Sequence, residues 1–291
     1  MSRLSFSGHE SFVCRQFWLK KGYDFVQAEG KFSDNMAVVS LGVGKNMVSS
    51  IRHWLKSFGL TDDKDNSLEL SEYLFGEQGK DIYLEDLATQ WLLHYALIKT
   101  NRASLYNLVF NEFRKERIEF TKTHLDAFIK RKCEETNSVY TPNTIKSDIS
   151  VFLRTYIGPK RGDNFSVEDD YAGVLIDLNL IEHFKASGTD DKLMDWYRIP
   201  SSEHKDLPNE VLLYSILDNE DYGDTISFRE LQVGLNSPGL VFSLTNDSLY
   251  QKVNELCDKY EEITYSETAG NQIIQFKNKP VKWDVLNDYY G

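Results

Sequence analysis

The fold of the N-terminal part of the chain is decided by residues 35–58, which run NMAVVSLGVGKNMVSSIRHWLKSF. From Val48 to Phe58, apolar residues recur at spacings of three, four and three, as one buried helix face requires. Gly42 supplies a tight turn at a place where a β-carbon would clash. The stretch therefore predicts two helices that flank Gly42 and form a helix-turn-helix.

The exposed face of the predicted second helix carries cationic and hydrogen-bonding side chains. Such side chains contact base edges and phosphates when a helix lies in a major groove. An ordinary helical hairpin with a solvated basic face has the same pattern, so both interpretations stay open. The candidate DNA-binding residues of this helix are Lys45, Asn46, Ser49, Arg52, His53 and Lys56.

The remainder of the first hundred residues predicts a small, mostly helical domain. Helices are expected over 12–25 and 84–98, where apolar residues recur at helical spacing. Leu68-Glu69-Leu70 has the alternation of a short strand, which would add a wing to the helix-turn-helix. We therefore expect a first domain over residues 1–100.

A second group of helices is expected over residues 101–161. The three expected helices cover residues 105–117, 123–135 and 142–156. Thr141 is a natural N-cap for the last of them. This region predicts a helical bundle or a second helix-turn-helix, and the linker-like stretch 158–162 ends it. Its candidate DNA-binding residues are Asn143, Lys146, Ser147, Arg154, Lys160 and Arg161.

Residues 162–291 predict a C-terminal α+β domain. Helices are expected over 209–217, after Ser227 with its capping-box partner Glu230, and over 246–260. Two β-prone runs follow, separated by Ala269-Gly270-Asn271, which is typical of a hairpin turn. The chain is thus expected to be mainly α with small β wings. Its parts would be an N-terminal (winged) helix-turn-helix, a central helical bundle and a winged-helix-like C-terminal domain.

The net charge of −12 is unevenly distributed along the chain. Residues 1–60 carry eight Lys and Arg against four Asp and Glu, whereas residues 162–291 carry ten against twenty-five. Phosphate contacts dominate the affinity of nucleic-acid binders, and local potential governs docking more than total charge does. The basic segments are therefore candidates for DNA contact, and the acidic C-terminal half is expected to dock a protein partner.

Several functional classes find no support in the sequence. Because no apolar run approaches the ~18 residues that span a bilayer, and no signal peptide is visible, a cytoplasmic protein without membrane contact is expected. The three cysteines are too widely separated for a disulfide framework or a zinc site. The segment before Lys45 resembles a phosphate loop, but Val39 and Asn46 replace required residues. We expect no catalytic site, no metal and no cofactor.

Three segments resemble the bacterial family of unknown function numbered four thousand and seven: Phe6-Ser7-Gly8-His9-Glu10-Ser11-Phe12, Trp18-Leu19-Lys20-Lys21-Gly22 and residues 39–60. The most specific part is LGVGKNMV followed by IRHW. The resemblance implies an accessory role in DNA phosphorothioation and phage-defence gene islands, beside reductase-like and cysteine-desulfurase genes. It implies no established catalytic residues. Its hallmark positions, whose role it leaves open, are His9, Glu10 and Arg15.

We therefore expect an accessory protein that binds double-stranded DNA and brings a sulfotransfer or reductase-like modification enzyme of the same operon to it. A transcriptional regulator of the defence operon is one alternative, and it would bind a specific sequence as a homodimer. A protein-binding scaffold without DNA contact is another. The acidic loop 62–65 is the best sequence evidence for the scaffold.

Overall fold

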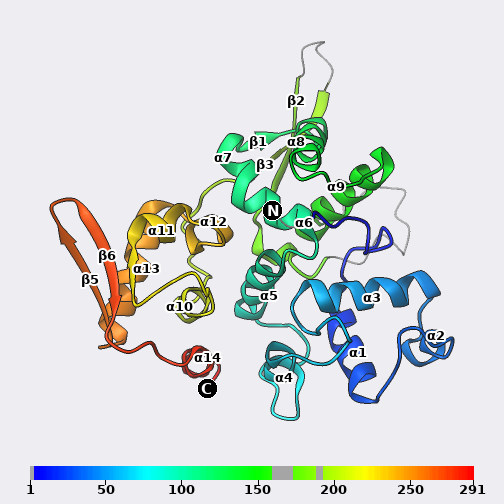
Figure 1. Cartoon of the computed structure of the whole chain (residues 1–291), viewed down its shortest axis with the longest axis horizontal. Coiled ribbons are helices and arrows are strands. Elements are labelled where there is room, and N and C mark those ends of the chain that lie inside the picture. Colours follow the sequence, from blue (N-terminus) through cyan, green and yellow to red (C-terminus); the bar gives the residue numbers. More distant parts are fainter. Residues whose placement is uncertain (1–2, 159–172, 188–192) are drawn as a thin grey trace. The chain divides into compact units, whose positions relative to one another are not determined.

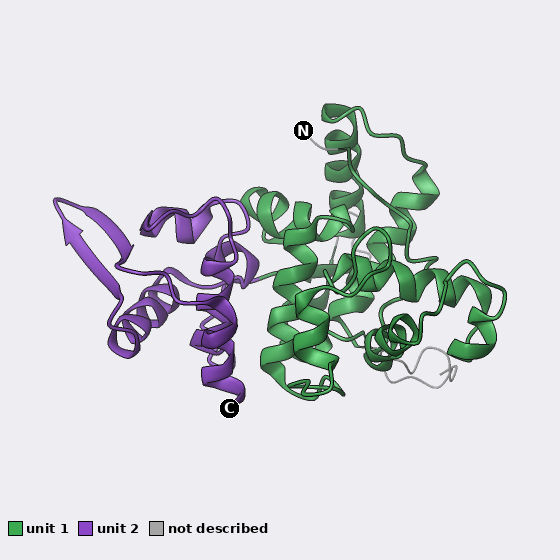
Figure 2. Ribbon diagram, turned by 60° about the horizontal axis from the view of Figure 1, so that its bottom comes forward, with its two compact units in different colours: residues 1–199 green, residues 200–291 purple. Residues whose placement is uncertain are grey.

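The computed structural model describes residues 3–158, 173–187 and 193–291. It is mainly helical with small β elements, as predicted, and these form two small three-stranded antiparallel sheets. The chain divides into two compact units, residues 1–199 and 200–291 (Figure 2). The sequence predicts domain boundaries after residues 100 and 161. Both positions lie within the first unit, and the division into units falls after residue 199.

Residues that follow the linker-like stretch 158–162 belong to the first unit because they form hydrogen bonds with residues that precede it. The backbone amide of Val174 donates to the carbonyl of Cys14 at 3.1 Å. The side-chain amide of Gln90 donates to Asp177 at 3.3 Å. These contacts span 160 and 87 positions of the sequence, and no local signal announces them.

The N-terminal helices of the first unit are α1 (Gln16–Gln27), α2 (Ala37–Leu41), α3 (Lys45–Ser57) and α4 (Glu69–Phe75) (Figure 1). Helix α1 packs against both α2 and α3. It approaches α3 most closely at Gly22, where an added β-carbon would lie 2.7 Å from Leu55 and 2.8 Å from Ile51. The two helices predicted on either side of Gly42 are confirmed.

The strand predicted at Leu68-Glu69-Leu70 is wrong, because α4 begins at Glu69. Leu70, Leu74 and Phe75 are buried on one side of this helix, so Leu70 follows a helical period and not the alternation of a strand. Three residues are too few to distinguish the period of a helix from the alternation of a strand.

The central helices of the first unit are α5 (Leu87–Thr100), α6 (Ser104–Leu108), a π-helical segment η1 (Val109–Phe113), α7 (Arg114–Glu116), α8 (Lys122–Glu135) and α9 (Pro142–Tyr156). The three helices predicted over 101–161 are confirmed, although the first contains the π-helical segment. Helix α5 is buried on nearly every side and holds a hydrogen bond of 2.9 Å between His94 Nδ1 and the Tyr156 hydroxyl. This bond joins the predicted first domain to the second.

The first sheet has the strand order β1 (Glu119–Phe120), β3 (Leu193–Arg198), β2 (Glu182–Ser187), with both pairs antiparallel. A short 3₁₀ helix, η2 (Ile176–Leu178), precedes β2. The pairing of Phe120 with Tyr197 ties the segment between α7 and α8 to residues that follow the linker-like stretch 158–162 by more than thirty positions.

The second unit contains α10 (Asn209–Leu217), β4 (Thr225–Ser227), α11 (Phe228–Val233), α12 (Pro238–Val241), α13 (Asn246–Lys259), β5 (Ile263–Thr268), β6 (Asn271–Phe276) and α14 (Lys282–Tyr290). Its sheet order is β4-β6-β5. The predicted hairpin is confirmed, with Ala269 and Gly270 at φ of 51° and 79°. The predicted capping box at Ser227 is also confirmed. Helix α14 was not predicted, and it packs on α10.

Candidate nucleic-acid interface

The turn between α2 and α3 consists of Gly42, Val43 and Gly44. Gly42 has φ 61° and ψ 34°, a left-handed conformation that glycine adopts without steric cost. The Lys21 ammonium donates to the carbonyl of Leu41 at 3.1 Å and so caps the end of α2 from α1. The turn therefore fixes where α3 begins, and with it which side chains of α3 face outward.

The first two turns of α3 present the predicted polar residues to solvent. Lys45, Asn46 and Ser49 are exposed, whereas Val48 and Ile51 on the opposite face are buried. This part of the helix matches the predicted DNA-binding face.

The second half of α3 is different, because its two cations bind a carboxylate of this chain. The Arg52 guanidinium donates to both oxygens of Asp65, at 2.8 and 2.7 Å. The Lys56 ammonium lies 2.8 Å from the same carboxylate and donates to the carbonyl of Asp63 at 2.9 Å. Burial raises the pKa of Asp65, but the hydrogen bonds from Arg52 and Lys56 outweigh it and lower the pKa. Arg52 and Lys56, two of the predicted DNA-binding cations, thus bind groups of the protein itself.

His53 faces the N-terminal segment of the chain and not open solvent. Its Nε2 lies 3.3 Å from the Ser57 hydroxyl, and a β-carbon on Gly8 would lie 2.2 Å from its Nδ1. Burial, followed by the nearby His9 and Arg102, lowers the pKa of His53 to about 3. The ring is therefore neutral near pH 7 and supplies no positive charge to a DNA surface.

The hallmark His9 is a buried structural residue. Its ring stacks on Trp54 with the planes 18° apart, and its Nε2 lies 3.1 Å from Asp148 of α9. Its Nδ1 accepts a hydrogen bond of 3.1 Å from the backbone amide of Ser11. Because Nδ1 accepts this hydrogen bond, a proton lies on Nε2, which faces the Asp148 carboxylate at ion-pair distance without forming a hydrogen bond to it. These contacts fix the orientation of the ring.

The other two hallmark residues lie apart from this buried pair. Glu10 is exposed and has φ 49°. The Arg15 guanidinium lies 5.2 Å from the ring centroid of Trp18, a cation–π contact. The sequence motif therefore reflects a folded N-terminal segment and not a single polar cluster.

The same segment contacts α9, which carries the second set of predicted residues. The hydroxyls of Ser147 and Ser11 are 3.0 Å apart, and Arg154 donates to the carbonyl of Ser11 at 2.8 Å. Asn143 and Lys146 are exposed on the same helix. Lys160 and Arg161 lie outside the described residues.

Residues 7–12 thus join the two predicted DNA-binding helices. The Trp54 indole donates to the carbonyl of Phe12 at 3.1 Å on the α3 side. On the α9 side, both oxygens of Asp148 accept from the backbone amide of Ser7, at 3.1 and 3.2 Å. Sequence reasoning missed this bridge. Asp148 carries the contact on the α9 side, and no local pattern in the sequence distinguishes it from other acidic residues.

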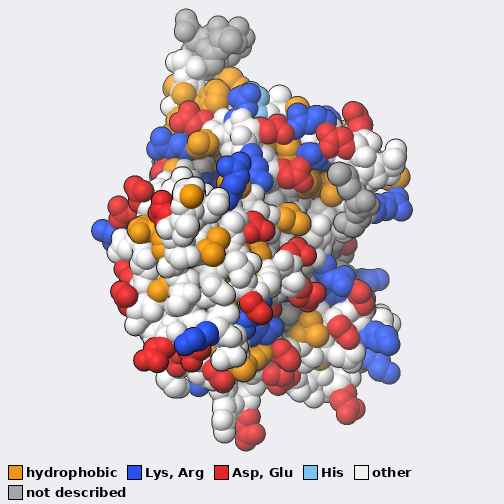
Figure 3. Space-filling model, turned by 60° about the vertical axis from the view of Figure 1, so that its left-hand side comes forward, with side chains coloured by type: hydrophobic (Ala, Val, Ile, Leu, Met, Phe, Trp, Pro, Cys, Tyr) orange, Lys and Arg blue, Asp and Glu red, His pale blue; other side chains and the backbone are white. Residues whose placement is uncertain are grey.

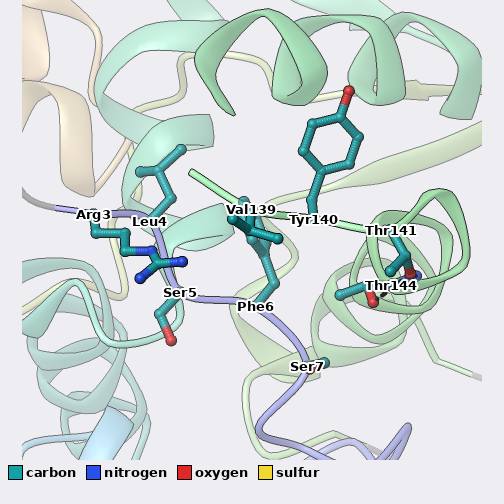
Figure 4. A pocket seen from close by; sticks show the side chains of 9 residues that line it. All are labelled: Arg3, Leu4, Ser5, Phe6, Ser7, Val139, Tyr140, Thr141 and Thr144. Atoms are coloured by element: carbon teal, nitrogen blue, oxygen red, sulfur yellow. Dashed lines mark hydrogen bonds between the residues drawn. The ribbon is translucent and has the colours of Figure 1, made fainter. Parts of the chain in front are cut away.

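Two grooves of the first unit lie beside these segments. One, of about 460 Å³, lies between the N-terminal segment and the start of α9, with Arg3, Phe6 and Val139 on its walls (Figure 4). The Tyr140 ring points away from Phe6 in this view. The other, of about 580 Å³, lies beside α3 and includes Arg52 in its lining.

The surface charges are mixed. On the face that Figure 3 shows, Lys and Arg side chains are interspersed with Asp and Glu and do not gather into one basic field. No helix in the described ranges is long and apolar enough to cross a membrane. Within those ranges, His, Cys, Asp and Glu form no group of three or more that could hold a metal ion.

The fold and this site define a mainly helical protein whose N-terminal segment is hydrogen-bonded to both α3 and α9. The chain belongs to the family described as protein of unknown function (DUF4007), whose model matches residues 6–290. Two solved structures, the SspB crystal structure and its magnesium ion-bound form, are similar with TM-scores of 0.83 and 0.84. Each is 26% identical to this chain, and the match covers 98% of this chain and 88% of the other. No curated protein matches the chain significantly.

Proposed function

We propose that the protein binds double-stranded DNA through the first turns of α3 and acts as an accessory subunit of a bacterial DNA-modification defence system. The observation that supports DNA contact is the exposed set Lys45, Asn46 and Ser49, which directly follows the left-handed turn at Gly42. In helix-turn-helix proteins, the N-terminal residues of the second helix contact base edges.

The proposed DNA interface contains fewer residues of α3 than the sequence predicts. Arg52 and Lys56 bind Asp65, so we assign them to the position of the 61–67 loop and not to phosphates. Substitution of Arg52 or Lys56 would therefore change DNA binding only through a change in the position of this loop. The direct contacts fall to the N-terminal half of α3, with Asn143 and Lys146 of α9 as further candidates.

The biological setting rests on the family resemblance and on the similarity to SspB. We propose that this chain brings the modification enzyme of a phosphorothioation-type system to DNA. We propose that the acidic second unit, whose order of helix, strand, helices and hairpin resembles that of a winged helix, docks the enzyme. The magnesium ion belongs to the similar structure. Among the described residues of this chain, His, Cys, Asp and Glu side chains form no group of three or more that could hold a metal ion.

A protein-binding scaffold is the second candidate, and one observation favours it. The acidic loop that follows α3 places Asp63 and Asp65 beside the predicted DNA face. If their charge dominated, DNA would be repelled and a basic protein surface would be attracted.

Fluorescence anisotropy with random and operon-upstream duplexes across a salt series tests these possibilities. The proposal expects binding whose log K falls linearly with log salt, by about 0.9 per phosphate neutralised. Lys45→Ala with Asn46→Ala should weaken that binding. A strong preference for the upstream duplex would select the regulator, and no binding at low salt would select the scaffold. Nicking of supercoiled plasmid by the purified protein would contradict a purely non-catalytic role.

A further inference from the structure

The loop at residues 61–67 is held against α3 as a closed, rigid turn. Thr61 and Ser67 form an isolated antiparallel bridge across its base. Asp62 accepts hydrogen bonds of 2.8 Å from the backbone amides of Lys64 and Asn66 and from the Asn66 side chain. The loop therefore has one defined conformation, in the place along the chain where a wing follows a recognition helix.

Each aspartate of this loop is engaged within the protein. Asp62 holds the turn itself, and Asp63 binds Arg102 at 2.7 Å. Asp65 binds both Arg52 and Lys56, so two positive charges face one negative charge. The acidic stretch that argues against DNA in the sequence is thus neutralised in the structure.

The cationic side chain that the 61–67 loop exposes is Lys64. Lys64 is exposed at the tip and lines the groove of about 580 Å³ beside α3. Lys31, from the turn between α1 and α2, is exposed on the same groove. Glu29 and Asp65 are the acids of the lining, and Asp65 is already paired with Arg52. The groove therefore carries a net positive charge next to the helix that is proposed to enter DNA.

From this arrangement we infer that Lys31 and Lys64 bind the phosphodiester backbone of DNA at the groove beside α3. The inference rests on the proposed function and adds the second contact that positions the duplex. Phosphate contacts fix register without carrying sequence information, so these lysines set affinity and orientation. Arg52 and Lys56 are positioning residues here, since they hold the loop that presents Lys64.

The test compares four proteins by fluorescence anisotropy with one random duplex between about 50 and 200 mM salt. These are the wild type, Lys31→Ala/Lys64→Ala, the charge-conserving Lys31→Arg/Lys64→Arg, and Lys185→Ala/Lys277→Ala. The last pair is also exposed and removes the same charge at positions remote in the sequence. We expect the slope of log K against log salt to be less steep by about 1.8 in Lys31→Ala/Lys64→Ala, and unchanged in the other two variants.

The outcomes separate this inference from the proposed function. If the Lys31→Ala/Lys64→Ala slope equals that of the Lys185→Ala/Lys277→Ala control while Lys45→Ala/Asn46→Ala still weakens binding, the groove assignment alone is overturned. If the wild type itself does not bind at low salt, the proposed function fails and the groove assignment fails with it. A slope restored by the arginine pair supports a charge contact and excludes a folding defect.

Discussion

The contact between Gly8 and His53 allows a sharp test of how the N-terminal motif works. A β-carbon at residue 8 would lie 2.2 Å from His53 Nδ1, 2.7 Å from Cε1 and 3.0 Å from Cγ. Carbon and nitrogen atoms in ordinary contact are about 3.5–4.0 Å apart, so the ring would have to move by more than about 1 Å. It cannot move freely, because it lies edge-on to both His9 and Trp54.

We therefore expect Gly8→Ala to destabilise the first unit by about 1–3 kcal/mol, the usual range for overpacking. In a His53→Ala background the ring is absent, and the same change should be neutral or slightly stabilising, since alanine restricts the unfolded chain. The double-mutant cycle should give a coupling of similar size and opposite sign.

Urea unfolding followed by tryptophan fluorescence measures this cycle. Four of the five tryptophans lie in the first unit, so the signal reports chiefly on the part of the chain that the mutations affect. The reasoning is refuted if Gly8→Ala unfolds within about 0.5 kcal/mol of the wild type, or if it costs the same in both backgrounds.

Three further predictions concern charge, pH and capping. Asp148→Ala removes the acceptor of the Ser7 backbone amide and the carboxylate beside the buried His9 ring, so we expect a loss of about 2–4 kcal/mol in urea unfolding; a loss near zero would show that this carboxylate is dispensable. Since the folded pKa of His53 is about 3 and its ordinary value 6.5, the unfolded chain binds its proton first as the pH falls. The stability should thus rise with pH between about 3 and 6.5, by at most about 1.4 kcal/mol per pH unit, and His53→Asn should flatten the measured pH profile. Ser227→Ala removes the cap that pairs with Glu230 and should speed amide exchange in α11 by an amount equivalent to about 1 kcal/mol, with exchange in α3 unchanged as the control.

Most helices of this protein follow from local signals. Helix α9 begins where Thr141 caps it and Pro142 fits its first turn, and it ends at the predicted Tyr156. The hairpin of the second unit follows from Gly270 between two alternating runs. Such signals act within a few residues, so they are visible in the sequence.

The role of the candidate site could be predicted only in part. The sequence identifies the exposed face of α3, because helical periodicity separates Lys45 and Ser49 from the buried Ile51. It does not show that Arg52 meets Asp65, thirteen residues later, since the two face each other only after the loop closes across the Thr61–Ser67 bridge.

The sequence by itself determined a mainly helical chain, a glycine turn between two short-range helices and a hairpin near the C-terminus. Tertiary structure alone decided the unit boundary, the burial of His9 against Asp148 and the neutralisation of the acidic loop. The physical reason is range. Caps, turns and periodicity involve neighbours along the chain, whereas the ion pairs and ring contacts of the site join residues up to about 140 positions apart, whose meeting depends on packing of the whole first unit.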